Sequence, residues 1–202
     1  MTRKTRVAVL YGGKSGEHEV SLKSAASVLR YLDRERFEPV PVSIDKNGRW
    51  QCHDLRRIDA ANTESLPIPA ESPSVRFEHQ ADGRTAILPS DADAAAIAPV
   101  DVVFPVIHGP LCEDGSLQGL LELAGAAYVG SGVLGSAVSM HKDIAKRLAA
   151  LAGLPVAPYF AVARRDYRRV VVLARSTSAD EAVLRALVAL DLGVLERLPV
   201  GR

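Results

Sequence analysis

Residues Val7–Ser21 read VAVLYGGKSGEHEVS, and the expected fold follows from this stretch. The apolar run from Val7 to Leu10 is typical of a strand buried on both faces, and Gly12-Gly13 predicts a tight turn directly after it. Strand, turn and helix in this order predict the start of a βαβ unit. The helix should run from about His18 to Leu32, because apolar residues recur at helical spacing at Leu22, Ala25, Ala26, Leu29 and Leu32.

Later apolar runs extend the same α/β architecture. Strands are predicted at Pro39–Ile44 and Val102–Ile107, and a helix is predicted from Ser116 to a C-terminal cap at Gly125. Because a helix connects the first two strands, they should run parallel. The sequence therefore predicts a parallel sheet flanked by helices.

Turn dipeptides and capping signals place the remaining elements. Asn47-Gly48 and Asp82-Gly83 predict hairpins, and a short strand is expected at 126–130. One continuous helix is predicted from about Ser136 to Leu151, with Met140, Ile144, Leu148 and Leu151 on one face. A strand at Val170–Ala174 and a helix after the capping box Ser178/Glu181 complete the expected elements.

Composition excludes several classes of protein. The chain has 202 residues, 48% hydrophobic and 24% charged, with a formal net charge of +1, which gives no electrostatic footprint for nucleic acid or anionic lipid. No apolar run is long enough for a signal-peptide core or a membrane span, so we expect a cytoplasmic protein that does not bind a membrane. Cys52 and Cys112 are far apart and lack metal-ligand spacing, so no metal site is predicted.

The glycine turn nearly fits two nucleotide-binding motifs and fails both. A P-loop would need glycine at Ala8, and a dinucleotide fingerprint through Gly13 and Gly16 would need glycine at Tyr11. The helix start remains a potential anion site, but Glu17 and Glu19 occupy its first turn. Glu19 is expected to act as a simple helix-start acid, whereas Glu17, nearer the turn, could face an ammonium group. A zwitterionic amino acid would use both features.

The second distinctive loop, HGPLCEDGSLQG from His108, should lie at the same sheet edge, because ligands of open α/β sheets bind beyond the carboxyl ends of the strands. His108 could either close a strand by bonding backbone or serve a ligand, and the two readings weigh about evenly. Glu113 and Asp114 are expected to satisfy first-turn amides of the next helix. By periodicity alone, Lys142 is a solvated helix lysine.

Four segments in this order resemble the N-terminal domain of D-alanine–D-alanine ligases, an ATP-grasp family: GGKSGEHEVS, HGPLCEDGSLQG, YVGSGVLGSAVSMHKDIAKRL and AGLPVAPY. The resemblance runs from Val7 to about Phe160. It implies a Rossmann-like pre-ATP-grasp domain at 1–135, then a linking helix and the beginning of an ATP-grasp domain at 136–202. It also implies a homodimer that uses ATP and Mg²⁺ to join two D-alanines, through an acyl phosphate, for peptidoglycan precursors.

The resemblance also implies roles for individual residues. Glu17 would hold the ammonium group of the first D-alanine, and His108 would lie beside that substrate. Gly12, Gly13, Ser21 and Gly109 would contribute to binding the amino acid. Gly12 and Gly13 would do so by letting the backbone approach it. Lys142 would lie near the nucleotide phosphates.

The sequence departs from the family pattern in two places. Cys112 stands where the H-G-x-x-G-E-D-G signature has glycine, and if that position takes positive φ the cysteine costs on the order of 1 kcal/mol. The family's V-K-P strand, Gly-Ser loop and magnesium-binding acids have no counterpart after the AVLRALVAL helix. We therefore expect a ligase cut short near Gly193 and inactive by itself. The alternative is a non-catalytic module that binds a small amino acid or an anion, and a regulatory nucleotide-binding domain is weakened by the failed glycine motifs.

Overall fold

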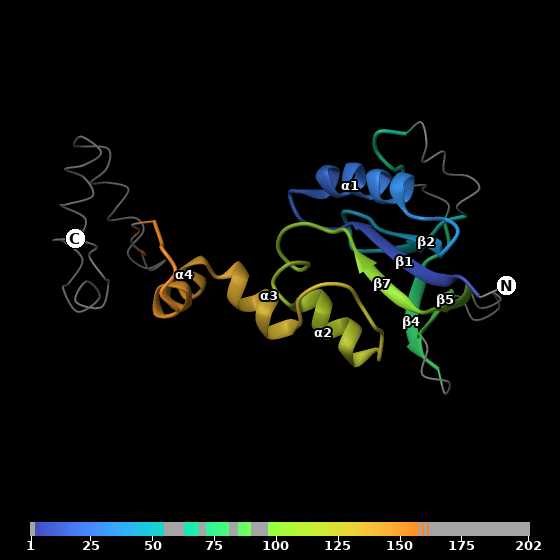
Figure 1. The fold of residues 1–202 in the computed structure, drawn as a ribbon. Coiled ribbons are helices and arrows are strands. Elements are labelled where there is room, and N and C mark those ends of the chain that lie inside the picture. Colours follow the sequence, from blue (N-terminus) through green and yellow to red (C-terminus); the bar gives the residue numbers. More distant parts are fainter. Residues whose placement is uncertain are drawn as a thin grey trace. The chain divides into compact units, whose positions relative to one another are not determined.

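The computed structural model describes residues 3–54, 63–68, 72–80, 85–89, 97–157, 159 and 161. The chain divides between Lys142 and Asp143 into two units, which are described separately. The first unit has a four-stranded sheet of order β3-β2-β1-β7 and a three-stranded antiparallel sheet of order β4-β5-β6 (Figure 1). The predicted elements after residue 161 lie outside the described residues.

The central strand, β1 (Thr5–Gly12), is parallel to both of its neighbours, as predicted. It pairs with β2 (Phe37–Ile44) from Thr5↔Phe37 to Gly12↔Ile44, and with β7 (Val102–Pro105) from Val7↔Val102 to Leu10↔Pro105. Because both neighbours run in the same direction, the loops after β1 and β7 leave the same edge of the sheet.

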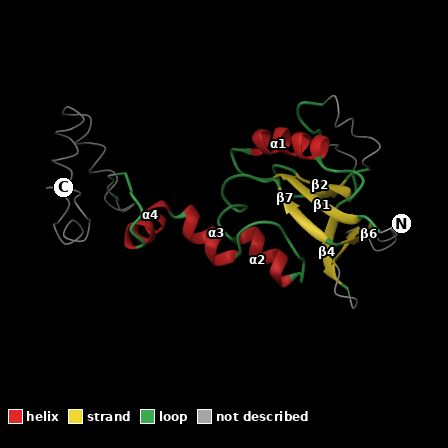
Figure 2. Ribbon diagram, viewed as in Figure 1, coloured by secondary structure: helices red, strands yellow, loops and turns green. Residues whose placement is uncertain are grey.

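Alternation along β1 divides the core between the two faces of the sheet. Val7, Val9 and Tyr11 pack with Leu22 and Leu29 of α1 (His18–Tyr31), which covers one face (Figure 2). The opposite face joins three other elements: β4 (Val75–His79), β5 (Thr85–Pro89) and α2 (Ser116–Leu123). The core residues on that face include Ala8, Leu10, Val75, Ile87 and Leu121.

Both hairpin predictions are confirmed. β3 (Trp50–Cys52) pairs antiparallel with β2 across the turn at Gly48, and β4 pairs antiparallel with β5. The structure adds β6 (Ile97–Val100), which was not predicted because it is short and ends one residue before β7. Asp101, between these strands, accepts a 2.7 Å hydrogen bond from the Arg6 backbone N–H and two more from the Arg3 guanidinium.

Two predictions about the later elements were wrong. The strand expected at 126–130 is a single parallel bridge, Val103↔Tyr128. The single helix expected from Ser136 to Leu151 is two helices, α3 (Val133–Met140) and α4 (Lys142–Leu151). They are separated by His141, whose ψ of 90° is extended. No glycine or proline marks this break, so the periodic pattern could not locate it.

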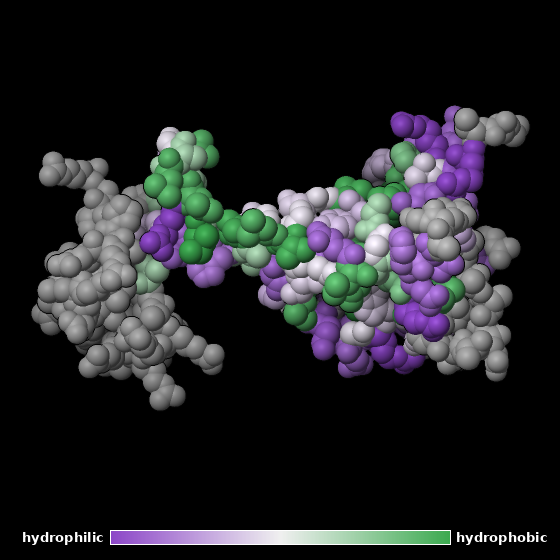
Figure 3. Space-filling view, turned by 90° about the horizontal axis from the view of Figure 1, so that it is seen from below, coloured by the Kyte–Doolittle hydropathy of each residue, from purple (hydrophilic) through white to green (hydrophobic). Residues whose placement is uncertain are grey.

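Apolar side chains are exposed on the helices of the first unit after the sheet. Leu123 at the end of α2 is 93% exposed and Leu134 in α3 is 77% exposed. The space-filling view shows apolar surface gathered over α3 (Figure 3). The predicted homodimer remains untested. None of the described helices is long and apolar enough to cross a membrane.

In the second unit, the first turn of α4 contacts Tyr159. The Tyr159 hydroxyl donates to Asp143 at 3.1 Å, and the Lys146 ammonium lies 4.6 Å from the centre of the Tyr159 ring. Ile144, Leu148 and Leu151 recur along α4 as predicted, but all three side chains are exposed.

A buried histidine, His53, forms hydrogen bonds at the edge of the four-stranded sheet. His53 follows β3, and its Nε2 and Nδ1 lie 2.6 Å from Ser43 Oγ and 2.7 Å from Ser72 Oγ. Burial lowers the pKa of His53 from the ordinary 6.5 to about 4, because the charged imidazolium is poorly solvated there.

This shift predicts a pH dependence of folding. Between about pH 6.5 and pH 4 the unfolded chain binds a proton at His53 that the folded chain does not, so stability falls as pH falls through this window. We expect a loss on the order of 3 kcal/mol, measured by urea denaturation at several pH values. His53→Gln should flatten the curve in this window, and an unchanged slope in that variant would contradict the assignment.

Candidate functional site

The candidate site is built from the loops that leave β1 and β7 at one edge of the sheet. The β1 loop begins with Gly12 and Gly13, at φ of 91° and 96°, values that L side chains rarely adopt. A Cβ on Gly12 would lie 2.3 Å from the Ile44 carbonyl oxygen, and a Cβ on Gly13 would lie 2.8 Å from Ile107 Cγ2. These glycines are therefore required by close packing within the protein, whereas the sequence analysis assigned them to substrate approach.

The Ser21 side chain connects the two loops by hydrogen bonds to the backbone of each. Its side chain is fully buried, accepts from the Gly12 backbone N–H at 2.8 Å, and donates to the Val106 carbonyl at 2.5 Å. The hydroxyl thus joins the end of β1 to the segment following β7. Its predicted role in binding substrate stays a prediction, and these contacts favour an indirect role.

The two loops lie in direct contact, as the sequence analysis required. Ser15 Oγ donates to the His108 carbonyl at 2.6 Å. Gly109 has a φ of 79°, and a Cβ there would lie 3.1 Å from Ser15 Cβ and 3.3 Å from Glu17 Oε2. Only glycine therefore brings the His108 segment this close to Ser15 and the Glu17 carboxylate.

The two acids of the first α1 turn have different environments. Glu17 occupies the N-cap position but makes no side-chain cap hydrogen bond, and its side chain is exposed. Glu19 lies 2.9 Å from Lys46 Nζ, and this hydrogen bond lowers the pKa of the Glu19 carboxyl. Glu19 is thus a helix-start acid on the surface, as predicted, whereas Glu17 is directed towards the second loop.

His108 is half-buried between α1 and its own loop. Nε2 lies 3.1 Å from Ser24 Oγ on α1, and Nδ1 lies 3.8 Å from the Glu113 carboxylate. Glu113 and Asp114, which were both expected to satisfy first-turn amides of α2, therefore have different partners. Asp114 accepts from the backbone N–H groups of Leu111 and Ser116 at 2.9 and 3.0 Å, which lowers its pKa, whereas Glu113 faces His108.

The positive φ that the sequence analysis considered for Cys112 occurs one residue earlier, at Leu111. Leu111 has a φ of 72°, and it is the sole non-glycine with positive φ in the described ranges. Cys112 is buried, and burial, followed by the charges of Asp114 and Glu113, raises the pKa of its thiol to about 12. The cysteine therefore acts as a packed apolar side chain, and the condition on which the sequence analysis expected strain at Cys112, a positive φ, is not met there.

Two substitutions test the backbone strain at Leu111 and the packing of Cys112 separately. Leu111→Gly should leave stability unchanged or raise it by about 1 kcal/mol, because it relieves a left-handed leucine that is half exposed. Cys112→Gly should lower stability by about 1–2 kcal/mol, because buried contacts are lost and the unfolded chain gains freedom. Urea denaturation measures both, with Cys112→Ala as the control for the side chain alone. Stabilisation by Cys112→Gly would contradict the backbone assignment.

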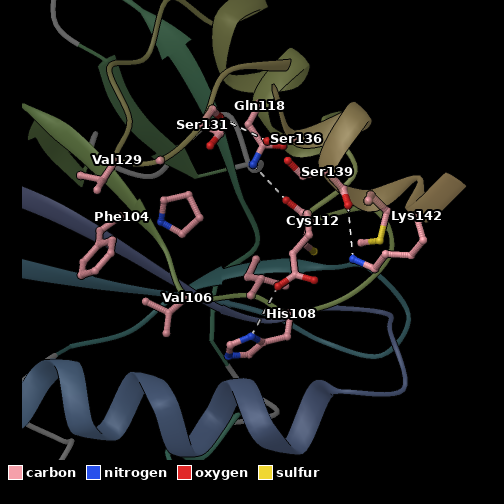
Figure 4. Close-up of a pocket in the computed structure, with 15 residues that line it drawn as sticks. Phe104, Val106, His108, Cys112, Gln118, Val129, Ser131, Ser136, Ser139 and Lys142 are labelled. Atoms are coloured by element: carbon pink, nitrogen blue, oxygen red, sulfur yellow. Dashed lines mark hydrogen bonds and ion pairs between the residues drawn. The ribbon is translucent and has the colours of Figure 1, made fainter. Parts of the chain in front are cut away.

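Beside His108, the end of β7 opens into a pocket of about 520 Å³ (Figure 4). Apolar residues Phe104, Val106 and Val129 line one side, and polar residues line the other. The polar set comprises Gln118 of α2, Ser136 and Ser139 of α3, the preceding Ser131, and Lys142. His108 and Glu113 also contribute, but Glu17 is not among the lining residues.

Lys142 lines this pocket from the first residue of α4, where Nζ donates to the Ser139 carbonyl at 3.2 Å. Sequence reasoning missed the role of Gln118 and the serines in the pocket. Both segments were quoted for the family resemblance, Gln118 within HGPLCEDGSLQG and the three serines within YVGSGVLGSAVSMHKDIAKRL, but no role was assigned to these four residues.

No group of three or more His, Cys, Asp and Glu side chains is arranged to hold a metal ion within the part of the chain that the structure describes. The described residues therefore do not fit a magnesium site by themselves. The geometry defines an α/β domain with a pocket at the carboxyl edge of a parallel sheet, the edge where ligands of open α/β sheets bind.

Comparison with known proteins gives the family. The family described as D-ala D-ala ligase N-terminus matches residues 6–131. The chain is 64% identical over 167 residues to D-alanine--D-alanine ligase A of Bradyrhizobium diazoefficiens, covering 83% of this chain and 45% of that protein. It is 49% identical over 159 residues to D-alanine--D-alanine ligase of Legionella pneumophila, covering 79% and 40%.

Solved structures agree with this match. The D-alanine-D-alanine ligase from Coxiella burnetii has a TM-score of 0.71 at 28% identity, covering 93% of this chain and 60% of that chain. The VanG D-Ala:D-Ser ligase from Enterococcus faecalis has a TM-score of 0.63 at 29% identity, covering 87% and 50%. The chain belongs to the D-alanine–D-alanine ligase family through its N-terminal domain. It spans less than half the length of the two curated relatives above.

Proposed function

We propose that this domain holds the first D-alanine in an ATP-dependent D-alanine–D-alanine ligase reaction. In that reaction the γ-phosphoryl group of ATP passes to the carboxylate of one D-alanine. The amine of the second D-alanine then attacks the acyl phosphate, the amide bond forms, and phosphate leaves. The observation that carries the proposal is the contact between the β1 loop and the His108 segment, at the Ser15 hydroxyl and at Gly109.

Glu17 is the proposed partner of the substrate ammonium group. Its carboxylate is exposed, makes no cap hydrogen bond, and lies against Gly109 at the edge where the two loops meet. A carboxylate and an ammonium group form a charge-assisted hydrogen bond, which is stronger than a bond between neutral groups. The positive end of the α1 dipole lies at the same place and favours the substrate carboxylate.

His108 is the proposed neighbour of the same substrate. Ser24 on one side and Glu113 on the other hold the imidazole between α1 and the pocket. A ring fixed in this way can present one nitrogen to a bound amino acid while the other stays paired. Gly12, Gly13, Ser21 and Gly109 would act by keeping the two loops in register.

The nucleotide part of the reaction rests on fewer described residues. Lys142 is the proposed contact for the ATP phosphates, and a lysine there neutralises the charge that develops during phosphoryl transfer. Magnesium supplies further neutralisation in reactions of this kind when it is bound. Because the described residues gather no ligand set for it, no step is assigned to the ion here.

Glu17→Gln tests the ammonium site directly. The variant should bind D-alanine about ten- to a hundredfold more weakly in calorimetry, because the neutral amide loses the ionic component of the contact. Glu19→Gln is the matched control, since Glu19 is an exposed acid in the same helical turn and is paired with Lys46. Equal weakening by both substitutions would show a general charge effect and contradict the assignment.

Turnover is a separate question from binding. The expectation that the 202-residue polypeptide is inactive by itself stays a prediction, checked by phosphate release in the presence of ATP, Mg²⁺ and D-alanine. Release that depends on both substrates would contradict it. Binding of D-alanine without release would support the alternative, a module that holds an amino acid without turning it over. Absence of D-alanine binding would overturn the proposed function itself.

A further inference from the structure

A buried histidine, His18, directly follows Glu17 and begins α1. It is only 5% exposed, and its Nδ1 lies 2.6 Å from the carbonyl oxygen of Gly13, at the other end of the β1 loop. A Cβ on Gly12 would lie 3.2 Å from His18 Cε1, so the ring also packs closely on Gly12. His18 therefore connects the beginning and the end of the loop that carries Glu17.

The hydrogen bond from His18 determines where its ring carries a proton. A carbonyl oxygen can only accept, so Nδ1 must carry the hydrogen. The bond forms with the neutral ring protonated on Nδ1 and also with the charged ring, since both have an N–H there. A replacement side chain can therefore keep this bond only if it has a donor at the δ position.

The backbone of Gly13 is held on both sides. Its N–H donates to the Ile44 carbonyl at 2.7 Å, and its carbonyl accepts from His18. Gly13 also approaches the segment that follows β7, because a Cβ on it would lie 2.8 Å from Ile107 Cγ2. The bond from His18 therefore sets the direction in which the chain leaves Gly13.

The loop between Gly13 and His18 is mostly exposed. Lys14, Gly16 and Glu17 are exposed to solvent, and a Cβ on Gly16 would meet no atom within 4 Å. A segment with few buried contacts opens easily unless hydrogen bonds hold it. The conformation of this loop therefore depends on the bonds at its ends and on those made by Ser15.

Ser15 makes the hydrogen bonds inside the loop. Its hydroxyl accepts from the Glu17 backbone N–H at 3.2 Å and donates to the His108 carbonyl at 2.6 Å. Its carbonyl accepts from the His18 backbone N–H at 3.3 Å. All three bonds belong to a turn whose two ends are joined by the His18 side chain. The position of the Glu17 carboxylate is therefore coupled to that side chain.

We propose that His18 is a positioning residue for the D-alanine site. Its hydrogen bond to the Gly13 carbonyl closes the loop and holds the Glu17 carboxylate at the place where the substrate ammonium group binds. His18 acts through Glu17 and does not touch the substrate. This inference rests on the proposed function, in which Glu17 binds that ammonium group.

Three substitutions test the donor. His18→Asn places an amide nitrogen at the δ position, His18→Gln places it one bond further from the backbone, and His18→Leu fills the space without a donor. The dissociation constant of D-alanine, measured by calorimetry, should rise about tenfold in His18→Leu and His18→Gln and stay within about threefold of wild type in His18→Asn. If His18 served packing alone, leucine would be tolerated better than asparagine, which leaves a cavity.

His53→Gln is the matched control. His53 is a second buried histidine, and its hydrogen bonds go to Ser43 and Ser72 at the sheet edge. This variant should lose stability and bind D-alanine like the wild type. Urea denaturation of every variant separates lost stability from lost binding. If His18→Leu does not fold, the Asn and Gln variants, both amides, carry the comparison.

A double variant tests whether His18 acts through Glu17. In the Glu17→Gln background the ionic contact is already lost, so adding His18→Leu should weaken D-alanine binding only about threefold or less, instead of about tenfold. NMR titration measures these weaker dissociation constants. Two losses that multiply in full would show that His18 supports the site in another way and would overturn the inference.

The outcomes distinguish this inference from the proposed function. Wild-type protein that does not bind D-alanine overturns the proposed function and this inference with it. Wild-type binding that is retained in His18→Leu, or lost equally in His18→Asn and His18→Leu, overturns this inference alone. Binding that is kept in His18→Asn, weakened in His18→Leu and unchanged in His53→Gln supports it.

Discussion

The buried hydroxyl of Ser21 is the contact on which the site geometry depends. It accepts from the Gly12 amide and donates to the Val106 carbonyl, so a single side chain from α1 connects the ends of β1 and β7. A buried backbone group that is left unpaired costs about 1–3 kcal/mol, so the hydroxyl stabilises both strand ends. The parallel pairing of β1 with β7 brings these two ends to one edge, and Ser21 sets the spacing between them.

In the loops that follow β1 and β7, the backbones approach each other closely at glycine residues. Positive φ at Gly12, Gly13 and Gly109 lets each loop pass where a Cβ would collide or press against its neighbour. The consequence is that His108 and Glu17, from loops some ninety residues apart, lie at the same edge. The left-handed Leu111, held by the Asp114 carboxylate, bends the second loop back so that Glu113 faces His108.

His108 separates two chemically different surroundings. On the α1 side lie Ser24 and the exposed acid Glu17. On the β7 side lies a pocket with an apolar wall, and Gln118, which lines it, has a buried Oε1 without a partner among the described residues. The family model, which matches residues 6–131, covers Glu17, Ser24 and His108.

The sequence by itself determined the alternation of β1, the parallel βαβ start, both hairpins and the pairing of the two loops, because apolar period and turn dipeptides are local signals. Tertiary structure decided the break at His141, the position of positive φ at Leu111 and the membership of Gln118 in the pocket. Each of these depends on which distant atoms surround a residue. A backbone angle or an unpaired amide oxygen is fixed by those neighbours and leaves no mark in local composition.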